Sequence, residues 1–291
     1  MIVRDSPYLA ANYPAMRSLP YLCLLLLFSL SSCTGDPETE DGASGAEQTE
    51  APPPPLEFVT YTYDDSTALR EHGPYFVYHL ETLRATGGPE ALREAINDSL
   101  DIRLFGFTVS DAVPLDTAVR AYLAPEFADY RAQEVQEEWL QEAPHTFARE
   151  QDELTEVVYR GDSLIVLAHR YYEYTGGAHG MHFTDLLPFS VDPPQLLDYD
   201  DVFLGGKEDT LSQLLLAKAM ETPDRIFGDS VPVTRNLAPL PEGVRFLYEP
   251  YAIGPYASGE IALDLPYASL RGILRPGVLE RLGLAEPLLR K

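Results

Sequence analysis

Alternating hydrophobic and polar positions predict several β-strands between Leu56 and Val191. Most of the hydrophobic positions are aromatic or β-branched, which favours strands. The sequence Arg160-Gly161-Asp162-Ser163 separates two of these segments and predicts a hairpin turn. The predicted strands are Phe58–Tyr63, Tyr75–Leu80, Leu154–Tyr159, Leu164–Tyr174 and Met181–Val191, and Asp192-Pro193-Pro194 breaks the last one.

Between the second and third predicted strands the hydrophobic period becomes helical. One apolar stripe has the four-residue spacing of Leu92, Ile96, Leu100 and Leu104. A longer helical stretch is predicted from Leu115 to Gln141, with an interruption at Pro125 and an end at Pro144. Its expected inward residues are Phe127, Tyr130, Val135 and Trp139, and a later helix is expected from Glu208 to Met220.

The C-terminal part returns to strands, at Val244–Tyr251 and Ile261–Leu265, and Pro266-Tyr267 is expected to open a short helix. Helices and hairpins are segregated along the chain, which predicts an α+β fold. We expect an N-terminal β/α companion domain, residues 56–150, packed with a C-terminal antiparallel-sheet-plus-helix domain, residues 151–291.

The first residues indicate export. Arg17 precedes the apolar run LPYLCLLLLFSL, which is too short to span a membrane and is followed by Ser31-Ser32-Cys33. The pattern predicts a signal peptide over 1–32, with Met16 as a second candidate start. The ending Leu-Ser-Ser-Cys resembles a bacterial lipobox, which would place a lipid and a membrane anchor on Cys33; the alternative is an ordinary secreted protein.

Residues 33–55 are acidic, contain no Lys or Arg and end in Pro52–Pro55. This composition predicts a disordered tether. Its acidic residues resemble the surface-export signal of Bacteroidota lipoproteins, so the expected location is the cell envelope, at the outer membrane, with surface display as one option. A generic solvated tether is the alternative.

Cysteine content and charge limit the chemistry. The chain has 2 Cys, one inside the apolar run (Cys23) and one at the lipobox (Cys33), so cysteine catalysis and Cys-liganded zinc are not expected. The formal net charge is −25. Nucleic acid is therefore not an expected partner, because phosphate binding needs Lys and Arg. A basic partner would be attracted, although acidity can also serve only solubility.

The sequence TGGAHG, residues 175–180, interrupts a tyrosine-rich strand. Gly176, Gly177 and Gly180 predict a tight turn that His179 holds through its ring nitrogens. The competing hypothesis is a catalytic or metal site of His179, His182 and Asp185, with His169 nearby. On a strand, residues 179 and 182 would face opposite sides, so we favour the turn and expect no metal and no cofactor.

The sequence Asp64-Asp65-Ser66 invites comparison with metal-dependent sugar deacetylases, but no His-x-x-x-His accompanies it. A strand that ends in an Asp-Asp-Ser turn is the simpler interpretation.

Three motifs occur in a recognisable order: TGGAHG, LLDYDDVF (196–203) and RFLYEPYAIGPYASGEIALDLPYASL (245–270). Together they resemble the extracytoplasmic domain shared by RsiV-like anti-sigma factors and PdaC-like peptidoglycan deacetylases. The resemblance implies a lysozyme sensor in the first group and a non-catalytic module in the second.

The expected function is that of a lipid-anchored, non-catalytic envelope protein that binds a cell-wall (peptidoglycan) fragment or a basic lysozyme-like protein. Tyr256, Tyr251 and Tyr174 are the candidate ligand contacts, with Tyr256 expected to be exposed in its Gly/Pro loop. The alternative is an envelope hydrolase or peptidoglycan deacetylase that uses His179 and nearby acids. A purely structural lipoprotein is a third hypothesis.

Overall fold

The computed structural model describes residues 54–284. These residues belong to one compact unit. The predicted signal peptide, Cys33 and the tether up to residue 53 lie outside the described residues. In the part of the chain from 54 to 284, no helix is long and apolar enough to cross a membrane.

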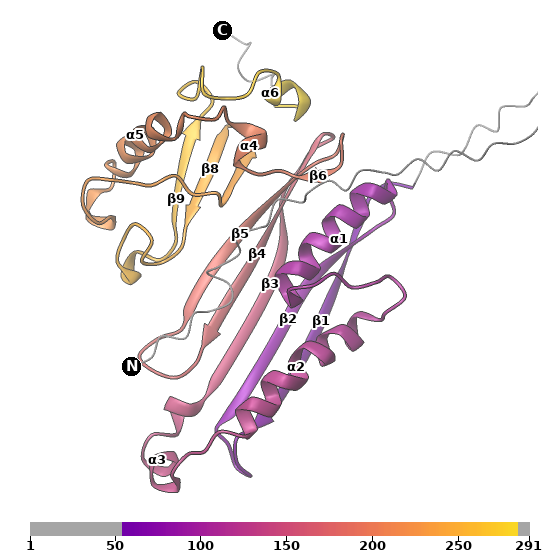
Figure 1. The fold of residues 1–291 in the computed structure, drawn as a ribbon, viewed down its shortest axis with the longest axis vertical. Coiled ribbons are helices and arrows are strands. Elements are labelled where there is room, and N and C mark those ends of the chain that lie inside the picture. Colours follow the sequence, from indigo (N-terminus) through magenta and orange to yellow (C-terminus); the bar gives the residue numbers. More distant parts are fainter. Residues whose placement is uncertain (1–53, 285–291) are drawn as a thin grey trace, which may run out of the picture. The chain divides into compact units, whose positions relative to one another are not determined.

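Strands and helices follow one another in blocks (Figure 1). The strands are β1 Glu57–Ala68, β2 Tyr75–Thr86, β3 Arg149–Arg160, β4 Leu164–Tyr174, β5 Met181–Ser190, β6 Gln195–Leu196, β7 Leu237–Leu240, β8 Gly243–Tyr248 and β9 Ile261–Pro266. The α-helices are α1 Glu90–Phe105, α2 Leu115–Arg131, α3 Glu137–Glu142, α4 Tyr199–Val202, α5 Glu208–Ala219 and α6 Val278–Arg281. The short 3-10 helices are η2 Pro144–Phe147, η3 Pro223–Arg225 and η4 Tyr256–Ser258.

Strands β1 to β6 form one sheet in sequence order. Neighbours are antiparallel except β2 and β3, which are parallel, so a crossover containing α1, α2 and α3 joins them. Strand β3 begins at Arg149, and the expected domain boundary at residue 150 therefore falls inside a strand of this sheet. Separate folding of the two predicted domains stays a prediction.

Helices α1 and α2 cover one face of this sheet (Figure 1). The four leucine and isoleucine residues that predicted α1 are all buried. Leu92, Ile96 and Leu100 pack on β4 and β5, and Leu104 packs with β2 and α2. Helix α2 packs on alternate residues of β2, namely Phe76, Tyr78 and Leu80. Because side chains alternate along a strand, the residues between these point to the opposite face of the sheet.

The second layer is the antiparallel sheet β7-β8-β9 with α4, α5 and α6. It packs on the opposite face of the large sheet, at Leu164, Val166 and Ala168 of β4 and Leu186 of β5. The predicted α+β class is confirmed. Near the start of β3 and the end of β4, this face carries polar side chains instead. This part of the face forms the candidate site.

Three local predictions are wrong. Helix α2 runs through Pro125 to Arg131, because buried residues on both sides of the proline hold it on the sheet and offset a cost of about 3 kcal/mol. Trp139 lies in the separate α3 and is 53% exposed. Residues 267–273 form turns, so Pro266-Tyr267 opens no helix.

The sequence Asp64-Asp65-Ser66 also differs from its prediction. It forms no turn, because β1 continues to Ala68 in register with β2, where Asp64 pairs with His79. The hairpin turn lies instead between Ala68 and Tyr75.

Candidate ligand-binding site

Two cross-strand rows of side chains lie on the sheet face opposite α1 and α2. In each row, strand register aligns one residue from each of β1 to β5, and aligned residues share a face. We call these two rows the outer rows. The first row is Asp64, His79, Asp152, Tyr172 and His182, and the second is Thr62, Glu81, Leu154, Arg170 and Thr184.

A pocket of 410 Å³ opens over the outer rows, and we call it the row pocket. Four residues of each row line it, from β2 to β5, and Glu260 joins them from the C-terminal layer. The volume is within the range of small-molecule sites. A ligand there would contact carboxylates, imidazoles, a guanidinium and tyrosine rings at once.

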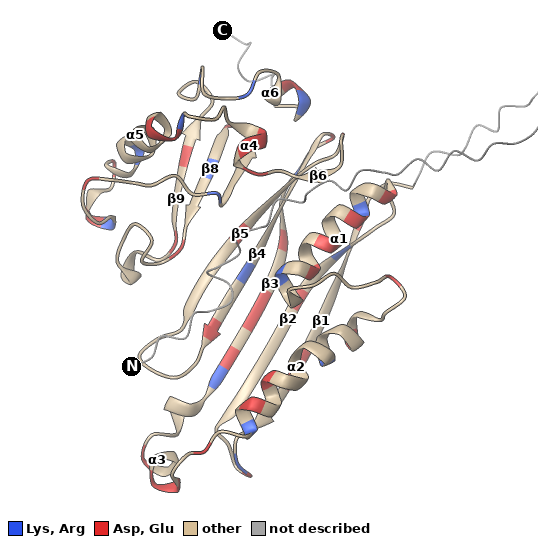
Figure 2. Ribbon diagram, viewed as in Figure 1, with Lys and Arg blue, Asp and Glu red and all other residues tan. Residues whose placement is uncertain are grey.

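Ionisable side chains on neighbouring strands interact with one another at the row pocket. His79 Nδ1 lies 2.5 Å from Asp64 Oδ1, and this hydrogen bond, aided by the charges of Asp152 and Glu81, raises the pKa of His79. Burial raises the pKa of Asp152, while the neighbouring His79 opposes that rise. Arg170 pairs with Glu156, outside the pocket lining. Figure 2 shows that acidic positions gather on β3, which is one of the four strands that line the pocket.

The TGGAHG sequence forms the loop between β4 and β5. Gly176 and Gly177 have φ of 86° and 110°, which only glycine adopts readily. Gly180 differs, because its φ is not positive and a Cβ there would lie 2.4 Å from the Tyr172 ring. The Tyr174 hydroxyl lies 3.1 Å from the Gly177 carbonyl oxygen, which fastens the loop.

His179 and His182 meet on one tyrosine. The His179 ring stacks on Tyr256 with centroids 3.8 Å apart, and His182 approaches the edge of the same ring at 6.0 Å. They converge because His179 lies in the loop before β5 and is not bound by strand alternation. His179 Nδ1 also lies 3.0 Å from the Gly180 carbonyl oxygen.

Tyr256 is only half-exposed, contrary to the expectation from its loop. Its hydroxyl donates to the Gly180 carbonyl oxygen at 2.7 Å and joins η4 to the TGGAHG loop. Tyr251 is the exposed residue of the pair, at 52%, and its ring lies 5.7 Å from that of Tyr256. Its φ of 73° is rare for a tyrosine, and such strain concentrates at functional sites. We call Tyr172, His179, His182, Tyr251 and Tyr256 the aromatic cluster.

The other predicted metal or catalytic residues lie elsewhere. Asp185 faces the helices and accepts from Arg103 Nε at 3.0 Å. His169 is buried on the same side, with Nε2 3.4 Å from Glu153 Oε2. His179, His182 and Asp185 therefore do not form one site. Among residues 54–284, no group of three or more His, Cys, Asp or Glu is placed to hold a metal ion.

Several groups of the row pocket were not singled out from the sequence: His79, Glu81, Asp152, Arg170 and Glu260. The alternation of β2 places His79 and Glu81 on one face, which was a usable signal. Their alignment with Asp152 on β3 and with β4 and β5 depends on strand register, which the sequence does not show. Glu260 reaches the pocket through packing of the second layer, and Thr184 Oγ1 donates to its Oε2 at 2.9 Å.

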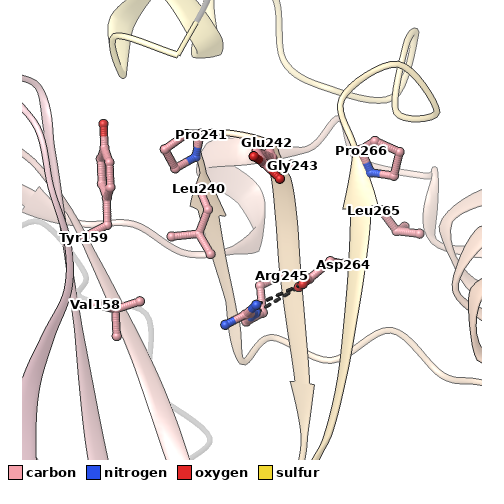
Figure 3. A pocket seen from close by; sticks show the side chains of 10 residues that line it. All are labelled: Val158, Tyr159, Leu240, Pro241, Glu242, Gly243, Arg245, Asp264, Leu265 and Pro266. Carbon is pink, nitrogen blue, oxygen red and sulfur yellow. Dashed lines mark hydrogen bonds and ion pairs between the residues drawn. The ribbon is translucent and has the colours of Figure 1, made fainter. Parts of the chain in front are cut away.

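A second pocket, of 560 Å³, lies between the end of β3 and the β7-β8-β9 sheet (Figure 3). Arg245 and Asp264 point at each other across β8 and β9, with two hydrogen bonds of 2.8 and 2.9 Å. This pair lowers the pKa of Asp264. Arg245 and Asp264 neutralise each other, and most other residues that line this second pocket are apolar. The smaller row pocket therefore has more polar groups for a ligand to contact.

Comparisons with known proteins agree with this architecture. Residues 200–268, from α4 to β9, match the family described as "Protein of unknown function (DUF3298)". The chain therefore contains a DUF3298 domain, and this domain supplies Tyr251, Tyr256 and Glu260. No curated protein matches the sequence significantly.

Two solved structures share the fold. A DUF3298 family member from Bacteroides fragilis is 22% identical, with a TM-score of 0.68 over 78% of this chain and 98% of that chain. A DUF3298 family protein from Pseudomonas aeruginosa PAO1 is 19% identical, with a TM-score of 0.56 over 77% of this chain and 97% of that chain. Both matches extend well beyond the DUF3298 segment, so the large sheet and the second layer recur together.

Proposed function

We propose that this protein is a lipid-anchored, non-catalytic protein of the cell envelope that binds a cell-wall saccharide in the row pocket. One observation carries the proposal: polar outer rows form the floor of a 410 Å³ pocket, and the aromatic cluster borders it. Sugar hydroxyls need donors and acceptors in fixed positions, and the apolar faces of sugar rings stack on aromatic side chains. The row pocket supplies both.

The anchor and the location belong to the same proposal. The lipobox-like Leu-Ser-Ser-Cys33 and the acidic tether support a lipid anchor at the outer membrane. The proline run at the end of the tether would hold the row pocket away from the membrane surface, where cell-wall strands are within reach. The resemblance to RsiV-like and PdaC-like extracytoplasmic domains favours the same compartment.

The geometry favours binding over catalysis. His179 Nδ1 lies beside the Gly180 carbonyl oxygen, and the His179 ring stacks on Tyr256. These contacts hold the loop in place. Asp185, the acid that the hydrolase hypothesis assigned to it, faces α1 on the other side of the sheet. A general base needs hydrogen-bond reach to its partner and substrate, and His179 and Asp185 do not share a side of the sheet.

A basic lysozyme-like protein is the second candidate ligand, and the acidic surface favours it. The net charge is −25, and acids gather on β3, where Asp152 lines the row pocket. Such a field raises the association rate of a basic protein more than its affinity. Specific binding would therefore need an aromatic anchor as well, and the exposed Tyr251 is suited to that role.

Calorimetric titration of residues 51–291 tests these proposals, with soluble peptidoglycan fragments in one arm and lysozyme in the other. Tyr251→Ala is expected to weaken fragment binding about tenfold, equal to about 1.4 kcal/mol, because a ring face is lost. Trp139→Ala removes an equally exposed aromatic side chain from α3 and is expected to change nothing.

Salt separates the two candidates. Fragment binding is expected to persist at physiological salt, where the Debye length is about 8 Å, whereas charge attraction alone fades. A different result would favour the protein ligand over the saccharide. In that result no fragment binds, and lysozyme binds in a way that resists salt and depends on Tyr251. Equal effects of Tyr251→Ala and Trp139→Ala would show that the aromatic cluster does not contribute to ligand binding.

A further inference from the structure

Glu260 holds one carboxylate oxygen without a partner. Its Oε2 accepts from Thr184 Oγ1 at 2.9 Å, but its buried Oε1 has no hydrogen-bond partner among residues 54–284. A buried polar atom without a partner is costly and is uncommon in folded proteins. Glu260 lines the row pocket, so a ligand in the pocket can supply the missing donor once a small rotation of the carboxylate exposes Oε1.

The backbone holds Glu260 in place. Gly259 has φ 64° and ψ −154°, a conformation that is essentially restricted to glycine. Arg225 Nη2 donates to the Ser258 carbonyl oxygen at 2.7 Å and lies 3.5 Å from that of Glu260. The backbone of Glu260 is thus positioned before any ligand binds, which lowers the entropic cost of binding.

The charge balance of the row pocket indicates the kind of donor. Its basic groups, His79 and Arg170, pair with Asp64 and Glu156, neither of which lines the pocket. The lining also contains the carboxylates of Glu81, Asp152 and Glu260. A cationic donor therefore complements this pocket better than a neutral one. Tyrosine rings beside carboxylates are also favourable for ammonium groups, through cation–π attraction.

We propose that the ligand of the row pocket carries a primary ammonium group, and that Glu260 Oε1 accepts a hydrogen bond from it. The proposal rests on the proposed function and deepens it by naming the recognised group. In a cell-wall fragment this ammonium can belong to an amino sugar without its acetyl group or to a diamino-acid side chain of the peptide part.

Matched probes test the ammonium group and separate its two sources. One pair consists of glucosamine oligomers and N-acetylglucosamine oligomers of equal length. The other pair is a lysine-containing cell-wall tetrapeptide and its Nζ-acetylated form. In one of the two pairs, the free amine is expected to bind residues 51–291 at least tenfold more tightly than the acetylated partner at physiological salt. The pair that shows this preference identifies the source.

Glu260→Gln is expected to abolish the preference, because the amide keeps the shape and can still accept from Thr184 but loses the charge. The matched control is Glu242→Gln, which removes the same charge from the second pocket and is expected to keep the preference. The control also measures general attraction by the acidic surface. The wild-type comparison of amine and acetylated probes decides the proposal even if Glu260→Gln folds poorly.

Equal binding of the amine and acetylated members of both pairs overturns the ammonium proposal but leaves saccharide binding standing. A preference that survives in a folded Glu260→Gln variant overturns the role of Glu260. If none of the probes and no peptidoglycan fragment binds, the proposed function itself fails. These three outcomes are distinct.

Discussion

The Gly176→Ala variant is expected to lose about 3 kcal/mol or more of unfolding free energy. Gly176 has φ 86°, and a Cβ there would lie 2.1 Å from the Thr146 carbonyl oxygen. That neighbour is backbone in the segment between α3 and β3, so it cannot swing away as a side chain would. The substitution therefore combines left-handed strain with a direct clash, and the loop or η2 must move.

Gly177→Ala is the matched control for this effect. Gly177 has φ 110°, but a Cβ there would meet nothing within 4 Å. Only the conformational cost applies, about 1–2 kcal/mol. Denaturant unfolding of residues 51–291 measures both variants. A Gly176→Ala variant that is as stable as Gly177→Ala would show that the contact with Thr146 does not restrict the loop.

The Arg84→Met variant is expected to lose about 3–5 kcal/mol at neutral pH, because it leaves a buried carboxylate without its cation. Asp101 on α1 is fully buried and pairs with Arg84 on β2. The Val109 backbone N–H also donates to Asp101, at 3.0 Å. Methionine fills much of the space of the arginine stem, so the loss reports the missing charge more than a cavity.

The pH dependence of this loss has a defined sign. Burial already raises the pKa of Asp101, and Arg84 opposes the rise. In Arg84→Met the folded-state pKa rises further above the unfolded value, so the folded state binds more protons between the two values. Stability of the variant therefore falls as pH rises through that window, and the deficit shrinks in acid. Unfolding at several pH values checks this, and a deficit independent of pH would contradict it.

A double variant separates charge from packing. Arg84→Met combined with Asp101→Asn removes both charges, and it is expected to recover part of the loss because a neutral amide costs less to bury than an unpaired carboxylate. A double variant as unstable as the sum of the two single variants would show that the pair has no favourable coupling.

The periodicity of the sequence predicts much of the fold in advance. Strand alternation and the Arg160–Ser163 turn predict the β3–β4 hairpin, and the four-residue leucine spacing predicts α1. The sequence fails where tertiary packing overrides a local preference. Pro125 does not stop α2, because the helix is anchored on the sheet through buried side chains before and after the proline.

The candidate site shows a different limit. The TGGAHG loop is visible in the sequence because glycine is required by the backbone itself. The outer rows are not visible, since they need the register of five strands and the parallel pairing of β2 with β3 through a long crossover. Tyr256 shows the same limit, because its burial depends on the contact between η4 and a loop about 76 positions earlier in the chain.

Chemical-shift mapping tests the central claim most directly. Amide signals of isotope-labelled residues 51–291 would be recorded during titration with soluble peptidoglycan fragments. The row pocket account predicts saturable shifts at His79, Asp152, Tyr172, His182 and Glu260, on four strands and the second layer, with no comparable shifts at Leu240 or Arg245 in the second pocket. Saturable shifts centred on the second pocket or on α1 and α2, or no shifts at all, would contradict it.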